Sequence, residues 1–300
     1  MEAVGIAIPF YRDVGYLRAA VGSVVAQSTG DWRLWVIDDS GGLEPETAVR
    51  EAVLSFADSR IAYERNPATL GMVPNWNRCL ERATTPLVTL LHGDDRLLPG
   101  YVALMQRLAA AHPATVALYC GAGIIGASGQ RVWSLPDAAK RLFAPRGRGE
   151  TVLHGEPGAS ALMRGNFIMC PTLCFRRALL GARRFEPGWE QVQDLELTVR
   201  LLMEGEQIVG SPEIAYAYRR HPESATTLQS ASRLRFDEEF RLFDVIATRA
   251  AELGWSETAR IARRKRIVKL HLLYRALRDL ARLRLGHALE TLQYLRRRWR

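Results

Sequence analysis

The sequence is poor in cysteine and has no long apolar run. Its four cysteines, Cys79, Cys120, Cys170 and Cys174, lack the paired spacing of a zinc site, and a chain of 300 residues can bury a sizeable core without disulfides. No apolar run approaches the ~20 residues of a membrane-spanning helix, and the first residues lack the segments of a signal peptide. We therefore expect a reduced, cytoplasmic protein that is at most peripheral to the inner face of a membrane.

Charge is distributed unevenly along the chain. The net charge is +9, but residues 260–300 contain fourteen Arg or Lys against only Asp279 and Glu290, so the remainder is slightly acidic. Apolar residues recur at helical spacing between these basic residues. Such a tail predicts either a membrane-surface contact or packing on the protein itself, including a homodimer contact. No nucleic-acid-binding module is recognisable, so we expect no nucleic-acid partner.

Short apolar runs alternate with amphipathic stretches in the first 125 residues. Strands are predicted at residues 4–8, 34–37, 61–63, 87–91 and 116–119. Helical spacing after the first strand, and at 73–83 and 102–110, predicts intervening helices. This alternation is typical of βαβ units and predicts an α/β fold with a mostly parallel sheet.

The second half of the chain is less regular. Scattered Gly, Pro, Ser and Arg predict a loop-rich insertion over residues 126–158. A strand near 167–170, a helix over about 194–204 and a strand at 214–218 follow. From about residue 230 the pattern is helical, with breaks expected at Gly254 and Gly286.

Two predicted strands end in adjacent carboxylates. Asp38 and Asp39 follow the second strand, and Asp94 and Asp95 follow the fourth. Ligands of open α/β sheets bind beyond the carboxyl ends of the strands, where hard oxygen ligands suit Mg²⁺ or Mn²⁺ holding a phosphate. Asp is also a good turn former, so each pair alone is equally compatible with a solvated turn.

Several motifs occur in a characteristic order. They are I-A-I-P-F-Y, W-V-I-D-D-S, N-P-A-T-L-G-M-V-P-N-W-N, L-L-H-G-D-D, W-E-Q-V-Q-D-L-E-L-T-V-R-L-L and Y-R-R-H-P-E-S-A-T-T. Over roughly residues 3–225 this order resembles the family-2 glycosyltransferases, which have the GT-A fold of nucleotide-diphospho-sugar transferases. The resemblance implies a mixed, mostly parallel sheet flanked by helices in a catalytic domain at 1–228, followed by a basic helical C-terminal extension at 229–300.

The resemblance also implies an activity. Members of the family transfer a sugar from a nucleotide-diphospho-sugar to an acceptor hydroxyl with inversion. The acceptor expected here is a saccharide or a lipid-linked saccharide, in surface polysaccharide or glycolipid synthesis. The Q-x-x-R-W motif of processive synthases is absent, which favours the addition of one sugar per encounter.

The donor site follows from the matching positions. By resemblance, Pro9 and Tyr11 flank the nucleobase, where an aromatic ring offers a flat apolar surface. Asp39 would accept a hydrogen bond from a pyrimidine N–H, which favours a UDP-linked donor. Asn66 and Asn75 would lie along the nucleotide.

The metal motif departs from the family pattern. The usual motif is Asp-x-Asp, but His92 stands in its first position and Asp94 in its second. We expect Asp94 to bind Mn²⁺ or Mg²⁺ with help from Asp95 and His221, while His92 either joins the metal or contacts a ribose or phosphate oxygen. Arg219, or the arginine that follows it, would bind the phosphates.

The acceptor side is expected around W-E-Q-V-Q-D. Asp194 matches the catalytic base of the family, while Gln193 replaces the acid that usually precedes it. Trp189 would form an acceptor wall, and Glu190 lies nearby as the alternative base. Asp194 is also a good helix N-cap, which is its structural interpretation.

Two other functions remain open at this point. A sugar nucleotidyltransferase shares the sheet topology, although no glycine- and arginine-rich triphosphate loop follows the first strand. A catalytically weak binding or partner subunit with the GT-A fold is also compatible with the sequence, because His92 and Gln193 replace two familiar acids.

Overall fold

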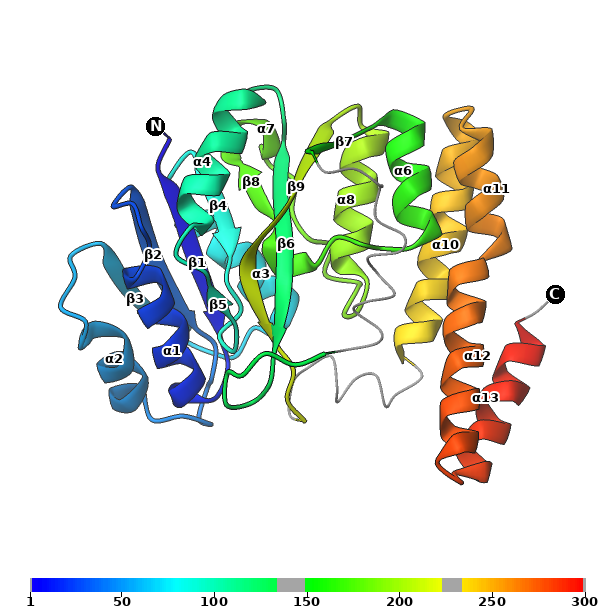
Figure 1. The fold of residues 1–300 in the computed structure, drawn as a ribbon, viewed down its shortest axis with the longest axis horizontal. Helices are drawn as coiled ribbons and strands as arrows, with labels where there is room; N and C mark the ends of the chain where they lie inside the picture. Colours follow the sequence, from blue (N-terminus) through cyan, green and yellow to red (C-terminus); the bar gives the residue numbers. More distant parts are fainter. Residues whose placement is uncertain (1, 134–148, 223–233, 299–300) are drawn as a thin grey trace.

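A nine-stranded mixed sheet forms the centre of the molecule in the computed structural model, which describes residues 2–133, 149–222 and 234–298 (Figure 1). The strands are β1 (Val4–Phe10), β2 (Trp32–Asp38), β3 (Ile61–Arg65), β4 (Leu87–Leu90), β5 (Arg96–Leu97), β6 (Ala117–Ile125), β7 (Thr151–His154), β8 (Cys174–Arg176) and β9 (Gln207–Arg219). Their order is β3-β2-β1-β4-β8-β6-β9-β5, and β7 also pairs with β9. Strands β1 to β4 are mutually parallel, whereas β8 runs antiparallel to both of its neighbours.

Helices cover both faces of the sheet. They are α1 (Val14–Val25), α2 (Glu46–Leu54), α3 (Met72–Arg82), α4 (Tyr101–Ala111), α6 (Gly155–Arg164), α7 (Arg177–Leu180), α8 (Gln193–Met203), α10 (Leu234–Glu252), α11 (Ser256–Arg264), α12 (Arg266–Ala281) and α13 (Leu285–Arg297), with a 3₁₀ turn η1 (Cys170–Thr172). Helices α1, α2 and α4 share one hydrophobic core, and α3, α6, α8 and α10 share the other. The C-terminal helices form an outer layer beside α6 and α8 (Figure 1).

The hydrophobic pattern explains the strands at the centre of the sheet. In β1, Ile6 and Ile8 face one core, while Ala7 between them faces the other. Every residue of β4 is buried, as expected for a strand covered on both faces. The predicted α/β class, with its mostly parallel sheet and a C-terminal helical extension, is confirmed.

The strand register brings the chemically interesting positions together. Phe10 of β1 lies opposite Asp38 of β2, which lies opposite Arg65 of β3. On the other side of β1, Ala7 pairs with Leu90 of β4. The residues that follow these strands therefore emerge at one edge of the sheet.

Three expectations for the second half were wrong. No strand forms at 167–170; the strand β8 lies at 174–176, after a 3₁₀ turn in which Pro171 cannot donate to a ladder. The supposed loop at 126–158 contains β7 and the start of α6, while its residues 134–148 lie outside the described ones. Gly286 lies inside α13, and the break falls at Leu283, whose φ is 58°.

Two further expectations concern the C-terminal extension. Gly254 does separate α10 from α11, with a φ of 74° that favours glycine. The expected domain boundary at residue 228 lies outside the described residues. Within the described ranges, no helix combines the length and the apolar character needed to cross a membrane.

Close packing between β6 and β9 gives a test of the fold. A Cβ added at Gly210 would lie 1.9 Å from the buried ring of Tyr119, so we expect Gly210→Ala to lower the free energy of unfolding by about 1–3 kcal/mol through overpacking. The matched control is Gly286→Ala, where an added Cβ meets no atom within 4 Å and should be neutral or stabilising by about 0.5–1 kcal/mol. Urea denaturation measures both, and equal effects of the two substitutions would contradict the packing argument.

Candidate active site

The carboxyl edge of the sheet opens into a cavity of about 1690 Å³. Most of the predicted site residues line it, namely Pro9, Tyr11, Asp39, Asn75, His92, Asp94, Trp189, Glu190, Asp194 and His221. Asn66, Asp95 and Arg219 are buried instead and do not line the cavity. The sequence motifs therefore lie together at one site. Asn66, Asp95 and Arg219 lie behind the residues that line the cavity.

Asp39 organises the end of the cavity that lies beside the strand ends. Its Oδ1 accepts hydrogen bonds from Asn66 Nδ2 at 2.7 Å and from the Leu70 N–H at 2.8 Å, and its Oδ2 accepts one from the Gly71 N–H at 2.9 Å. Asn66 Nδ2 also donates to Asn75 Oδ1 at 3.0 Å. Because a carboxylate has about four acceptor positions, Asp39 keeps capacity for a ligand N–H while holding the loop beside it.

Asp38 has a separate, structural role. Its Oδ1 accepts from the Ser40 N–H at 2.9 Å, and its Oδ2 accepts from Tyr63 Oη at 2.7 Å. The side chain is fully buried. It holds the turn after β2, so that Asp39 faces the cavity.

Asp94 lies in a turn between β4 and β5, which closes with a hydrogen bond from the Asp95 N–H to the His92 carbonyl. His221 Nε2 lies 2.9 Å from Asp94 Oδ2. Burial raises the pKa of Asp94, but the hydrogen bond with His221 and the nearby imidazoles outweigh burial and hold it below its ordinary value. Asp94 is therefore favoured as a carboxylate on the cavity wall.

The residues around Asp94 fit a divalent cation. Ligand atoms of His92, Asp94 and Asp95 lie within 4.8 Å of one another, and the buried His92 Nε2 has no hydrogen-bond partner. One imidazole nitrogen with carboxylate oxygens suits Mn²⁺ better than Mg²⁺. His221 is not in this group of ligand atoms and contacts Asp94 from another direction.

Asp95 and Arg219 lie behind the turn. Asp95 Oδ1 accepts from the Arg219 N–H at 2.6 Å, and its Oδ2 accepts from Tyr216 Oη at 2.9 Å. Burial, reinforced by the charge of Asp94, raises the pKa of Asp95 well above its usual range. Arg219 donates from Nε to the Asp94 carbonyl and stacks over Tyr16 at 4.5 Å.

Two neighbouring arginines, Arg219 and Arg220, have different surroundings. The buried Arg219 also donates from Nη1 to the carbonyls of Gly126 and Ala127, so it supports the turn that carries Asp94 from behind. Arg220 lines the cavity itself. Of the two arginines considered for phosphate, Arg220 is the one placed to meet a ligand.

Asp194 occupies the first turn of α8. The residue at the N-cap position is Val192, so the interpretation of Asp194 as a cap is wrong. Asn166 Nδ2 lies 3.3 Å from Asp194 Oδ2. The charges of Asp94 and Asp194 both raise the pKa of His92 against the dominant effect of burial, which lowers it.

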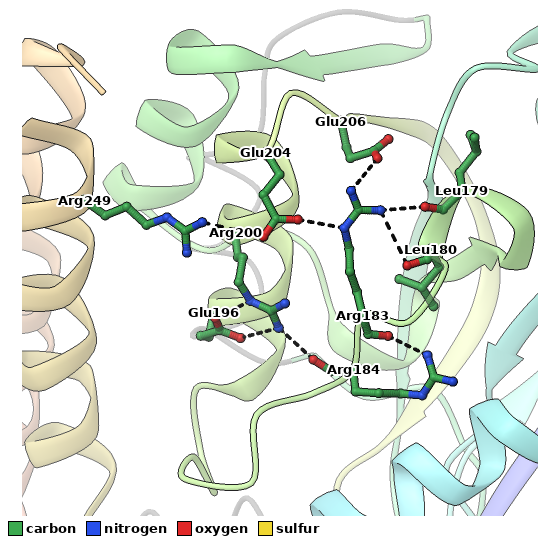
Figure 2. Close-up of polar contacts among 9 residues, drawn as sticks. All are labelled: Leu179, Leu180, Arg183, Arg184, Glu196, Arg200, Glu204, Glu206 and Arg249. Carbon is green, nitrogen blue, oxygen red and sulfur yellow. Dashed lines mark hydrogen bonds and ion pairs between the residues drawn. The ribbon is translucent and has the colours of Figure 1, made fainter. Parts of the chain in front are cut away.

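An ion-pair network anchors α8 to the segment that precedes it (Figure 2). Arg183 contacts Glu204 at 2.7 Å and Glu206 at 2.9 Å. Arg200 pairs with Glu196 at 2.7 Å and donates to the Arg184 carbonyl at 2.7 Å. These contacts fix the helix that carries Asp194.

Sequence reasoning missed two parts of the site. Trp76 of α3 packs against His92, with ring centroids 5.1 Å apart, and against Phe185 at 5.3 Å. Its place in the N-W-N motif was the available signal. The far wall comes from α10, α12 and α13, including Phe236 and His271, and their helical pattern gave no indication that they line a cavity.

The arrangement defines a class of protein. In fold, the chain is similar to solved nucleotide-sugar transferases of the GT-A type. A crystal structure of S. aureus TarS 1-349 in complex with UDP-GlcNAc matches with a TM-score of 0.65 and 15% identity, covering 88% of this chain and 72% of that one. The mannosyltransferase PcManGT from Pyrobaculum calidifontis, in complex with GDP-Man and Mn²⁺, matches with a TM-score of 0.61 and 14% identity, covering 97% and 85%.

The family follows from the sequence. The chain belongs to glycosyl transferase family 2, whose family model matches residues 5–170. The glucosyltransferase WfgD of Escherichia coli, described as a UDP-Glc:alpha-D-GlcNAc-diphosphoundecaprenol beta-1,3-glucosyltransferase, is 32% identical over 92 residues, 31% of this chain and 35% of its own length. The matches to curated relatives span about a third of those proteins.

Gly71 gives a test of the loop that Asp39 holds beside the cavity. Its φ of 91° and ψ of 169° lie in a region reserved for glycine, and this conformation directs its N–H to Asp39. We expect Gly71→Ala to cost about 1–3 kcal/mol of unfolding free energy through backbone strain, although an added Cβ meets no atom within 4 Å. Gly42→Ala, which also meets no atom and whose φ is not positive, is the control in the same denaturation measurement. A loss no larger than that of the control would refute the strain argument.

Proposed function

We propose that this protein transfers a sugar from a nucleotide-diphospho-sugar to an acceptor hydroxyl with inversion, one sugar per encounter. The observation that carries the proposal is that Asp94 and Asp194 both line one cavity. In this proposal Asp94 serves the diphosphate side of the reaction and Asp194 serves the acceptor. Membership of glycosyl transferase family 2 supports this division.

The donor is proposed to lie along the strand ends with its base near Pro9, Tyr11 and Asp39. Tyr11 is about half exposed at the cavity, so its ring is accessible for stacking. Asp39 has remaining acceptor capacity for the N–H of uracil, which favours a UDP-linked sugar. Asn66 positions Asp39 and Asn75 rather than lining the cavity. The UDP-GlcNAc and GDP-Man complexes of the similar structures support the donor class.

A divalent cation, preferably Mn²⁺, is proposed to be held by Asp94 and His92, while the buried Asp95 supports their turn from behind. When bound, it would neutralise charge that develops on the departing nucleoside diphosphate. Arg220 is placed to bind the same phosphates, and His221 orients Asp94. The Mn²⁺ complex of the similar mannosyltransferase supports this ligand.

Asp194 is proposed as the catalytic base. Asn166 donates a hydrogen bond to Asp194 Oδ2, which leaves Oδ1 to accept the proton of the acceptor hydroxyl. The acceptor oxygen then bonds to the anomeric carbon as the bond from that carbon to the diphosphate breaks on the opposite face. Trp189 lies beside this position as the acceptor wall, and the exposed Glu190 is the alternative base.

The acceptor is proposed to be a lipid-linked saccharide at the cytoplasmic face of a membrane. Helices α12 and α13 pack on each other and expose leucines, and Leu283 in the turn between them is 85% accessible. The same turn carries the exposed Arg282 and Arg284. Apolar and cationic side chains on one helical pair complement an anionic lipid surface. The diphosphoundecaprenol acceptor named for the E. coli relative supports this acceptor class.

Donor turnover tests the chemical proposal. The wild type should be stabilised in a thermal-shift panel of UDP-glucose, UDP-GlcNAc and GDP-mannose with Mn²⁺, and should release nucleoside diphosphate from the donor that binds. We expect Asp94→Ala and Asp194→Asn each to lower this release by at least about 100-fold. The control is Asp244→Asn, because Asp244 is exposed and lies on α10 away from the cavity.

Three results would contradict the proposal. Unchanged release in both variants would reject the assigned residues. Binding of a donor without release would favour a partner subunit. Consumption of nucleoside triphosphate with sugar 1-phosphate would favour a sugar nucleotidyltransferase.

Vesicle sedimentation tests the membrane proposal. We expect the protein to pellet with anionic phospholipid vesicles but not with neutral ones, and to be released by salt. Substituting both Leu283 and Leu285 by Ser should reduce pelleting several-fold, because each exposed leucine contributes about 1.5–3 kcal/mol when buried. Leu43→Ser, at an exposed leucine far from this pair of helices, is the control. A dimer by light scattering that the same substitutions dissociate, without vesicle binding, would assign this face to a second copy instead.

A further inference from the structure

The turn that leads into α8 is built partly by a helix far along the chain. Residues 188–191 carry Trp189 and Glu190 and end three residues before Asp194. They pack against α10, which begins at Leu234. This contact joins the proposed acceptor wall to the C-terminal extension.

Glu238 of α10 binds the backbone N–H groups of the turn 188–191. Its carboxylate accepts hydrogen bonds from the Glu190 N–H at 3.1 Å and from the Gln191 N–H at 2.8 Å. The side chain is 5% exposed, although glutamate is seldom buried without a partner. Two backbone donors on one buried carboxylate form charge-assisted hydrogen bonds, which are stronger than neutral ones.

Arg241, one helical turn further along α10, contacts a backbone carbonyl and the aromatic ring of the same segment. Its Nη2 donates to the Gly188 carbonyl at 2.6 Å, and its guanidinium lies 4.0 Å from the centre of the Trp189 ring. A planar guanidinium both stacks on an aromatic face and donates in its plane, which a lysine does not do. The turn is therefore held through its N–H groups, a carbonyl and the Trp189 ring at once.

The start of the same segment is fixed by other parts of the fold. Asn77 of α3 exchanges two hydrogen bonds with the Phe185 backbone, at 2.8 and 3.0 Å. Arg200 holds the Arg184 carbonyl, as Figure 2 shows. The segment is thus anchored by the sheet-covering helices at its start and by α10 at the turn that faces the cavity.

We infer that Glu238 and Arg241 are positioning residues, through which α10 sets the turn 188–191 and thereby the places of Trp189 and Asp194. The inference rests on the proposed function in one respect, because Asp194 is the proposed base. Neither α10 residue lines the cavity, so neither touches the reacting groups. Loosening the turn should lower turnover and leave donor binding, which uses the strand ends, unchanged.

Hydrogen–deuterium exchange measured by mass spectrometry tests the contact directly. In the full chain, Glu238→Gln removes the charge and one acceptor oxygen, so amides of a peptide covering 185–193 should exchange at least about tenfold faster, while those of β1 stay unchanged. Glu238→Asp keeps the charge with a shorter reach and should be intermediate. The control is Glu252→Gln, an exposed residue at the end of the same helix. Unchanged exchange in Glu238→Gln would overturn the inference.

Kinetics supply the second measurement, on nucleotide release from the donor that the wild type uses. We expect Glu238→Gln and Arg241→Gln to lower kcat by about tenfold or more with the KM for the donor unchanged, since misplacement of a catalytic group by about 1 Å has effects of this size. Arg241→Lys should have a kcat close to that of Arg241→Gln, because lysine cannot stack and donate as the guanidinium does. The control is Arg263→Gln, at an exposed site on α11, whose kcat should match that of the wild type. Faster exchange with unchanged kcat would overturn the positioning role. If the wild type uses no donor, the proposed function fails, whereas the exchange result still decides whether α10 holds the turn.

Discussion

The site depends on one buried junction, where the end of β9 meets the turn after β4. Asp95 accepts hydrogen bonds from the Arg219 N–H and from Tyr216 Oη, and Arg219 donates back to the Asp94 carbonyl. This junction is costly to bury, because a carboxyl group leaves water, and it is stable only because its oxygens are satisfied. Its geometric consequence is that His221, two residues after Arg219, reaches Asp94. The pairing of β5 with β9 brings the two strand ends together, and the junction fixes the side chains at that point.

The same physical device recurs around the cavity. Asp39 and Glu238 are buried carboxylates that accept backbone N–H groups of a neighbouring turn, and Asp95 accepts one from the end of β9. Each replaces the hydrogen bonds that a regular strand or helix would supply, so an irregular turn is held rigidly beside a ligand cavity. A carboxylate used in this way is a fixed part of the scaffold. Asp39 also lines the cavity, as Asp94 and Asp194 do, whereas Asp95 and Glu238 do not line it.

Sequence reasoning succeeded where the pattern is local and repetitive. The parallel strands β1 to β4 are short apolar runs whose carboxyl ends were expected to meet at one edge, and Asp39 and Asp94 both line the cavity there. It failed for β8, a strand of three residues whose pairing depends on the tertiary fold. It favoured Asp94 over Asp95 but could not separate Arg219 from Arg220, because adjacent residues of one type differ only in the direction of the side chain. Amphipathic periodicity shows that a helix has a buried face, and nothing in it identifies the surface that covers that face.

The basic C-terminal extension therefore divides into two physically different parts. Helix α10 buries Phe236, Phe240 and Phe243 in the core that also covers α8, and Glu238 and Arg241 contact the turn beside the cavity. Helices α12 and α13 bury Val268 and Leu272 toward that core but expose several leucines on their other sides. Because α12 also lines the cavity, one helix connects the proposed acceptor side of the site with the surface proposed to meet the membrane. That continuity favours an acceptor whose sugar lies in the cavity while its lipid remains at the membrane, since no long chain must then be buried in the protein.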